Sequence, residues 1–124
     1  IAQRAAQQWQ ATVVLKGADT LIAEPSGLVT FSPFANPALA SAGTGDVMAG
    51  ALTGLLAQGL TPETAAKCGV YVHGLAGEMA RADLGDAGVV AGDLLPRLPL
   101  AIRQLSSLKG ISGQGAAPSQ VLWS

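Results

Sequence analysis

Residues 41–58 read SAGTGDVMAGALTGLLAQ, and this stretch predicts a glycine-rich turn that leads directly into an apolar helix. Gly43, Thr44 and Gly45 form the turn, and Asp46 follows in the first helical turn. Asp near a helix start is common for stability alone, but the Gly-x-Gly sequence before it calls for a further explanation. The first turn of a helix presents unpaired backbone N–H groups, and glycines let an anion approach them. The stretch therefore predicts an anion hole at a helix start.

A carboxylate beside an anion hole suits phosphoryl transfer. Asp46 would face the bound phosphate and accept a proton from a substrate hydroxyl as that hydroxyl attacks phosphorus. The alternative is that Thr44 or Asp46 merely caps the helix while the glycines make a turn. Because short glycine motifs recur by chance, this stretch alone leaves both interpretations open.

The residues before this helix predict a small β-structure. Residues 2–9 are typical of the end of a helix, and ATVVLKG at 11–17 is typical of a buried strand stopped by glycine. Residues 20–25 and 27–32 flank the sequence PSG at 25–27. Since proline presets one turn dihedral and glycine permits a positive one, these residues predict a hairpin with a tight turn.

Two helices are predicted in the centre of the chain. The first covers 44–58 and carries Gly50 and Gly54 on one face, each at a cost of up to about 1 kcal/mol relative to alanine. We therefore expect another backbone to approach that face closely. The sequence TPE at 61–63 opens the second helix, which runs to about Ala82, with threonine as N-cap and proline at the first position.

The remaining segments are less regular. Residues 32–43 hold two prolines and predict a loop, and residues 91–106 predict one or two shorter helices broken by Pro96 and Pro99. From residue 106 the chain turns to serine, glycine and glutamine, which predicts a flexible tail over 106–124. The order of strand, hairpin, loop and paired helices predicts part of a layered α/β domain.

The composition narrows the class of protein. The chain is 49% hydrophobic and 12% charged with a net charge of −1, and no basic stripe indicates nucleic acid or an anionic membrane as partner. The single cysteine, Cys68, cannot form an internal disulfide, which suits a protein in a reducing compartment. We expect the side chain of Cys68 to be buried in the protein. Neither a signal peptide nor an apolar run of about 18 residues is present, so a soluble, cytoplasmic protein is expected.

Three segments resemble a known family in their order and spacing: VVLKGADTLIAEPSGLVTF at 13–31, NPALASAGTGDVMAGALTGLLAQGL at 36–60, and VYVHGLAGEMA at 70–80. The chain resembles the C-terminal half of the ADP-dependent NAD(P)H-hydrate dehydratases, members of the ribokinase-like superfamily. The resemblance implies a three-layer α/β/α sandwich. Residues 1–105 would form the C-terminal part of that domain, which fits a chain that begins with Ile1 inside a helix.

The resemblance also implies a reaction. In this family ADP phosphorylates the hydroxyl of the hydrated nicotinamide ring of (S)-NADHX or NADPHX, and elimination then restores NADH or NADPH and leaves AMP and phosphate. By similarity, Asp46 is the base that touches the hydrate, Gly45 lies in the AMP and anion site, and Asn36 shapes the substrate pocket. The implied nucleotide contacts are Lys16, Gly17, Ala18, Asp19 and Thr20, with Lys16 offering its charge to phosphate.

Some features depart from the family pattern or lie outside it. Ala42 and Ala35 stand where the family usually has glycine. No cluster of His, Cys and carboxylate residues has metal-ligand spacing, so we expect no dedicated metal site, although Mg²⁺ would arrive with the nucleotide phosphates. His73, the one histidine, is expected to be packed and hydrogen-bonded rather than catalytic.

Two other functions remain open from the sequence. The first is a ribokinase-like kinase that phosphorylates a hydroxymethyl group of a vitamin precursor or sugar. The second, which is not enzymatic, is an inert remnant or a nucleotide-binding half that acts only with a partner chain. The resemblance further implies that the protein forms a homo-oligomer.

Overall fold

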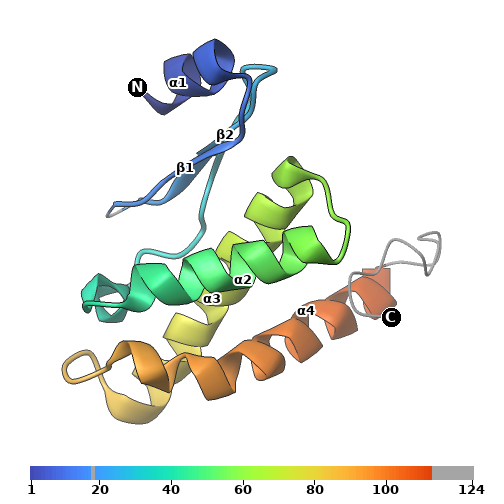
Figure 1. Cartoon of the computed structure of the whole chain (residues 1–124). Coiled ribbons are helices and arrows are strands. Elements are labelled where there is room, and N and C mark those ends of the chain that lie inside the picture. Colours follow the sequence, from blue (N-terminus) through green and yellow to red (C-terminus); the bar gives the residue numbers. More distant parts are fainter. Residues whose placement is uncertain (18, 113–124) are drawn as a thin grey trace.

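A computed structural model of the chain describes residues 1–17 and 19–112 (Figure 1). Helix α1 (Ala2–Trp9) is followed by a three-stranded antiparallel sheet in the order β1 (Val13–Leu15), β2 (Leu21–Ala23) and β3 (Val29–Phe31). The rest is helical, with α2, α3 and α4 as the long elements. In chain order the helices are η1 (Pro37–Ala40), α2 (Thr44–Ala57), α3 (Pro62–Leu84), η2 (Ala91–Asp93), η3 (Leu95–Arg97) and α4 (Leu98–Ser112).

The sheet separates two cores because successive strand residues point to opposite faces. Leu21 and Ala23 of β2 pack against Ala6 of α1, whereas Ile22 packs against Met48 of α2 and the neighbouring helix α3. Helix α1, the sheet and the α2–α3 pair thus form successive layers, with α4 beside α3 (Figure 1). The predicted α/β/α layering is confirmed.

The predicted hairpin is confirmed as the pairing of β2 with β3. Leu21 pairs with Phe31 and Ala23 with Val29. The turn closes through a 2.9 Å hydrogen bond from Gly27 N–H to the carbonyl of Glu24. Gly27 has a φ of +96°, the positive value that the sequence predicted for this position.

Strand β1 is less buried than the sequence predicted. It pairs only with β2 among the described strands, and Leu15 at its end is 43% exposed. The prediction of a buried strand is wrong because a β-branched run indicates a strand but not whether both of its edges and faces are covered. Cys68 was likewise expected to be buried, and its side chain is partly exposed.

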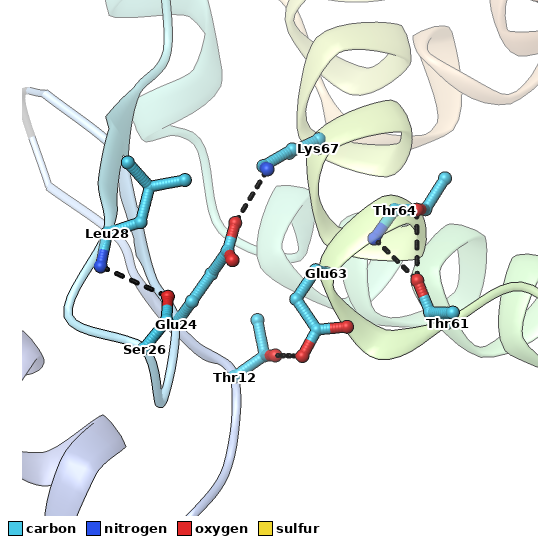
Figure 2. Close-up of polar contacts among 8 residues, drawn as sticks. All are labelled: Thr12, Glu24, Ser26, Leu28, Thr61, Glu63, Thr64 and Lys67. Carbon is cyan, nitrogen blue, oxygen red and sulfur yellow. Dashed lines mark hydrogen bonds and ion pairs between the residues drawn. The ribbon is translucent and has the colours of Figure 1, made fainter.

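Polar contacts tie the sheet layer to the start of α3 (Figure 2). Lys67 Nζ of α3 lies 2.6 Å from Glu24 Oε1 at the end of β2, and Thr12 Oγ1 donates to Glu63 Oε1 at 3.3 Å. The side chain of Thr61 accepts a hydrogen bond from the first turn of α3 and caps it, as predicted. These contacts hold the strand ends at a defined position over the helix pair.

The glycines of α2 do not play the part that the sequence predicted. Gly50 and Gly54 are exposed, and no atom lies within 4 Å of the position that a Cβ would take at either residue. The expected close approach of another backbone is therefore wrong within the described residues. Spacing places two glycines on one helix face, but only the packing of the chain decides which face is covered.

Close packing occurs instead at glycines of α3. A Cβ added to Gly74 would lie 3.0 Å from the Cβ of Phe34 and would overlap its ring, and one added to Gly77 would overlap the side chain of Leu39. The absence of these side chains lets the segment before α2 lie directly on α3. This segment, predicted to be a loop, also contains the short helix η1.

Helix α4 is longer than the sequence predicted. Pro99 lies in its first turn, where a missing N–H costs nothing, so this proline does not break the helix. The predicted boundary at residue 106 falls inside α4, which continues to Ser112, and Leu105 packs on the core between α3 and α4. Residues 113–124 of the predicted tail lie outside the described residues.

Substitution of the packed and the open glycines should have opposite effects. Gly74→Ala should lower the free energy of unfolding by about 1–3 kcal/mol, because Phe34 must move to make room for the methyl group. Gly50→Ala should raise it by up to about 1 kcal/mol, because alanine is the better helix former and nothing opposes it. Chemical denaturation measures both values, and a stabilising Gly74→Ala would contradict the close packing.

Candidate functional site

An open cavity of about 860 Å³ lies where the end of β1, the segment before α2 and the first turn of α2 meet. Most of the predicted site residues line it, although they come from separate parts of the chain. They are Lys16, Gly17, Thr20, Asn36, Gly43, Thr44, Gly45 and Asp46. Asp19 does not line the cavity, and Ala18 lies outside the described residues.

The glycine turn leaves two backbone N–H groups free. Gly43 is the N-cap of α2 and has a φ of +86°, a left-handed conformation that favours glycine. The N–H of Thr44 donates to Ser41 O at 3.3 Å, and that of Asp46 donates to Gly43 O at 3.1 Å. The N–H groups of Gly43 and Gly45 have no acceptor among the described residues. They are therefore available to an external anion at the positive end of the helix.

The side chain of Thr44 has a structural part. It is 2% exposed, and its hydroxyl lies 2.7 Å from the carbonyl oxygen of Leu39 and 2.8 Å from that of Ser41. This hydroxyl joins the preceding loop to the helix start and is not free for a ligand. No side chain caps the first turn of α2, so the alternative that Thr44 or Asp46 is a simple helix cap is wrong.

Lys16 brings a second positive group to the same turn. The side chain of this exposed residue reaches from the end of β1 to Gly45, where an added Cβ would collide with Lys16 Nζ. An ammonium beside a helix N-terminus repels the helix dipole, and an anion between them would turn this repulsion into attraction. Gly45 thus provides both an N–H donor and the space that the lysine occupies.

Asp46 is the one carboxylate among the described residues that line the cavity. It lies in the first turn of α2 and is exposed. Within residues 1–17 and 19–112, no group of three or more His, Cys, Asp or Glu side chains is placed to hold a metal ion. A single carboxylate suits Mg²⁺ that is held mainly by nucleotide phosphates.

Within residues 1–17 and 19–112, no helix has the length and apolarity to span a membrane.

Asn36 presents an unpaired donor in the cavity wall. Its Oδ1 accepts a 2.9 Å hydrogen bond from the N–H of Ala38 and so caps η1. The residue is 9% exposed, and its Nδ2 has no hydrogen-bond partner among the described residues. Because a buried donor without a partner is costly, this amide is suited to a polar ligand group or a water molecule.

His73 lies behind the glycine turn and is 1% exposed. Its Nε2 is 2.8 Å from the carbonyl oxygen of Thr44. Burial lowers the pKa of His73 from its ordinary value of 6.5; the hydrogen bond to Thr44 opposes this shift, and the charge of Lys16 adds to it. The imidazole is therefore neutral near pH 7. The prediction of a packed, hydrogen-bonded histidine is confirmed, while its contact with the glycine turn was not foreseen.

Several contacts at the site have no signal in the sequence. Phe34 lines the cavity and rests on α3. The hydroxyl of Ser41 donates to the carbonyl of Val89 at 2.6 Å, and Ala91 lies against Gly43. The segment after α3 thus supports the glycine turn from outside. Nothing in the residue types around Val89 and Ala91 predicts a neighbour so far away in the sequence.

These features define a class of protein: the chain is part of a layered α/β domain whose glycine turn opens a helix at a cavity, the arrangement expected of a ribokinase-like domain. Comparison with known proteins specifies the family. The chain belongs to the NAD(P)H-hydrate dehydratase family, whose family model matches residues 1–99.

Related proteins support this assignment, and the chain matches only a part of the length of each. The bifunctional NAD(P)H-hydrate repair enzyme of Moorella thermoacetica is 49% identical over 105 residues, which are 85% of this chain and 20% of that protein. The ADP-dependent (S)-NAD(P)H-hydrate dehydratase of Neisseria meningitidis is 42% identical over 87 residues, which are 69% of this chain and 29% of that protein.

A solved structure shows the same fold. The ADP/ATP-dependent NAD(P)H-hydrate dehydratase from Bacillus subtilis, co-crystallized with ATP/Mg²⁺, matches 83% of this chain and 37% of its own chain, with a TM-score of 0.78 and 35% sequence identity. The chain thus spans well under half the length of the relatives it matches.

The role of the Thr44 hydroxyl can be measured by its removal. Thr44→Val should lower the free energy of unfolding by about 1–3 kcal/mol, because the buried hydrogen bond that the hydroxyl shares between the carbonyls of Leu39 and Ser41 is lost. Thr53→Val on the exposed part of α2 removes a 2.7 Å bond to Ala49 O and should change stability by less than about 0.5 kcal/mol. Equal losses in chemical denaturation would show that Thr44 is not a structural anchor.

The lowered pKa of His73 makes stability depend on pH. The unfolded chain binds a proton near pH 6.5 while the folded protein does not, so the stability due to neutral His73 is complete above that pH. It should decline as the pH falls from 6.5 toward the lower pKa of the folded state. The stability advantage of the wild-type protein over His73→Gln should therefore shrink on acidification, as measured by denaturation at several pH values. An advantage that grows below pH 6.5 would mean that the pKa is raised.

Proposed function

We propose that the protein that contains this chain is an ADP-dependent NAD(P)H-hydrate dehydratase, which converts (S)-NADHX or NADPHX back to NADH or NADPH and leaves AMP and phosphate. The observation that carries this proposal is the meeting of two positive groups and one base at a single turn. The free N–H groups of Gly43 and Gly45, the ammonium of Lys16 and the carboxylate of Asp46 share one cavity. Membership of the family supplies the substrate class.

In the first proposed step the hydroxyl oxygen of the hydrated ring attacks the β-phosphorus of ADP. Asp46 accepts the hydroxyl proton, which makes the oxygen a better nucleophile. The bond between the β-phosphorus and the bridging oxygen breaks, and AMP leaves with the electron pair. The N–H groups of Gly43 and Gly45 and the charge of Lys16 stabilise the negative charge on the phosphoryl oxygens during transfer.

In the second proposed step the phosphorylated hydrate eliminates phosphate. The ring C–O bond breaks and phosphate takes the electron pair, while solvent water accepts a proton from the neighbouring ring carbon, whose C–H electrons form the double bond. Phosphorylation is necessary because phosphate is a far better leaving group than hydroxide. The same anion hole then holds the released phosphate.

The remaining predicted residues take supporting parts in this proposal. Residues 16–20 contact the nucleotide, with Gly17 and Thr20 lining the cavity beside Lys16. The free Nδ2 of Asn36 binds a polar group of the hydrate. Mg²⁺ enters with the nucleotide phosphates, since the described lining of the cavity has a single carboxylate to offer it.

We also propose a cytoplasmic, self-associating protein. A single cysteine and a net charge of −1 suit a reducing compartment without nucleic acid as partner. Size-exclusion chromatography with light scattering would measure the oligomeric state directly.

Replacement of the proposed base tests the function. In the full polypeptide that contains this chain, Asp46→Asn should lower kcat for ADP-dependent formation of NADH from NADHX by about 10²–10⁴-fold, because the proton acceptor is lost. The dissociation constant of ADP, from calorimetry, should change little. Asp86→Asn serves as the control, since Asp86 pairs with Arg81 outside the cavity.

Two outcomes would contradict the proposal. Normal turnover by Asp46→Asn would remove Asp46 as the base. A wild-type protein that leaves NADHX unchanged but phosphorylates a hydroxymethyl compound with ATP would instead be a kinase of the same superfamily.

A further inference from the structure

One of the two N–H groups of the proposed anion hole, that of Gly45, depends on the orientation of a single peptide unit. The carbonyl of Thr44 and the N–H of Gly45 belong to the same peptide bond, and in a trans peptide these two groups point in opposite directions. The Gly45 N–H has no acceptor among the described residues and lies in the turn that lines the cavity, beside Lys16. Thr44 is the first residue of α2, so the first helical turn already orients this peptide unit, and a further donor to the Thr44 carbonyl reinforces the direction of the Gly45 N–H.

His73 holds that carbonyl. Its Nε2 lies 2.8 Å from the Thr44 oxygen, and the residue is 1% exposed in the middle of α3. A carbonyl only accepts hydrogen bonds, so the proton of the neutral imidazole is on Nε2. The donor comes from a residue 29 positions away, on a helix that packs against α2.

We propose that His73 is a positioning residue for the nucleotide: by binding the Thr44 carbonyl, it holds the first peptide unit of α2 in place, so that the Gly45 N–H and Lys16 together receive a phosphate of ADP. This inference rests on the function proposed above, and it assigns His73 no contact with substrate.

A neutral donor is the appropriate group at this place. A lysine or arginine behind the turn would put a second positive charge near Lys16 inside the protein, where charge is costly. An aliphatic residue of similar size would fill the space but leave the orientation of the peptide unit to the turn alone. The imidazole supplies a hydrogen bond without charge, so Lys16 remains the cation of the site.

Two amide variants separate the hydrogen bond from the volume of the ring. His73→Gln places an amide nitrogen about where Nε2 lies, whereas His73→Asn has a shorter side chain that does not reach the Thr44 carbonyl. In the full polypeptide, His73→Asn should weaken ADP binding roughly tenfold and lower kcat for NADHX, and His73→Gln should keep most of both. Calorimetry gives the affinity, and NADH formation gives kcat and KM.

Val72→Ala is the matched control for a general loss of stability. Val72 is 3% exposed on the same helix and packs with Ala76 and Ala101 on the side of α4. This variant should lower Tm without weakening ADP binding. If it weakens binding as much as His73→Asn at an equal fall in Tm, the effect of His73 is only structural and the inference fails.

A second measurement uses the wild-type protein alone, so it does not depend on whether a variant folds. In amide NMR spectra, titration with ADP should shift the Gly45 N–H and the His73 Nε2–H together, because both belong to one hydrogen-bonded unit. A Gly45 signal that ADP does not move would overturn the proposal, as would equal ADP affinity in His73→Asn and His73→Gln. If the wild-type protein neither binds ADP nor converts NADHX, the proposed function itself fails, and this inference fails with it.

Discussion

The site depends on the hydrogen bonds around Thr44. The hydroxyl of this residue is shared between the carbonyls of Leu39 and Ser41, and its own carbonyl accepts from His73. Three segments therefore meet at one buried residue: the loop that contains η1, the start of α2 and the middle of α3. Because buried polar groups need partners, any other path of the glycine turn would leave several of them unsatisfied. This constraint fixes the path of the glycine turn, whose residues line the cavity.

The electrostatics of the cavity complement this arrangement. Lys67, Arg81 and Arg97 each pair with a carboxylate, whereas Lys16 forms no ion pair within the described residues and lies against a helix N-terminus. A positive group at the positive end of a helix is unfavourable without an anion. Such local conflicts are typical of functional sites, where the partner that resolves the conflict is the ligand.

Packing explains why the turn can lie so close to α3. Gly74 and Gly77 leave room for Phe34 and Leu39, so the segment before α2 rests on the helix that carries His73. The glycines of α2 attracted attention in the sequence because of their spacing, yet they face away from the described residues. The two sets look alike in the sequence. Only the arrangement of the helices distinguishes a glycine that makes room from one that is merely exposed.

The sequence-based predictions were correct where neighbouring residues decide the structure, and wrong where residues distant in the sequence decide it. The turn at Gly27, the cap at Thr61 and the helix that begins after Gly43 were all predicted correctly. The burial of β1 and the end of α4 were predicted wrongly, because both depend on neighbours that are distant in the sequence. Of the residues predicted to contact the nucleotide, Lys16, Gly17 and Thr20 line the cavity and Asp19 does not, and the nucleotide contacts themselves stay a prediction.

By itself, the sequence determined the features that a few neighbouring residues control: the turns, the helix starts, and a carboxylate placed directly after a Gly-x-Gly turn. Backbone sterics and local hydrogen bonds decide these features, so they can be read from adjacent residues. Only the tertiary structure decided that Lys16 reaches Gly45, that the Thr44 hydroxyl is buried, and that His73 binds the turn from behind. These contacts join residues up to 29 positions apart, and the way in which the sheet and the helices pack against one another decides which of them meet.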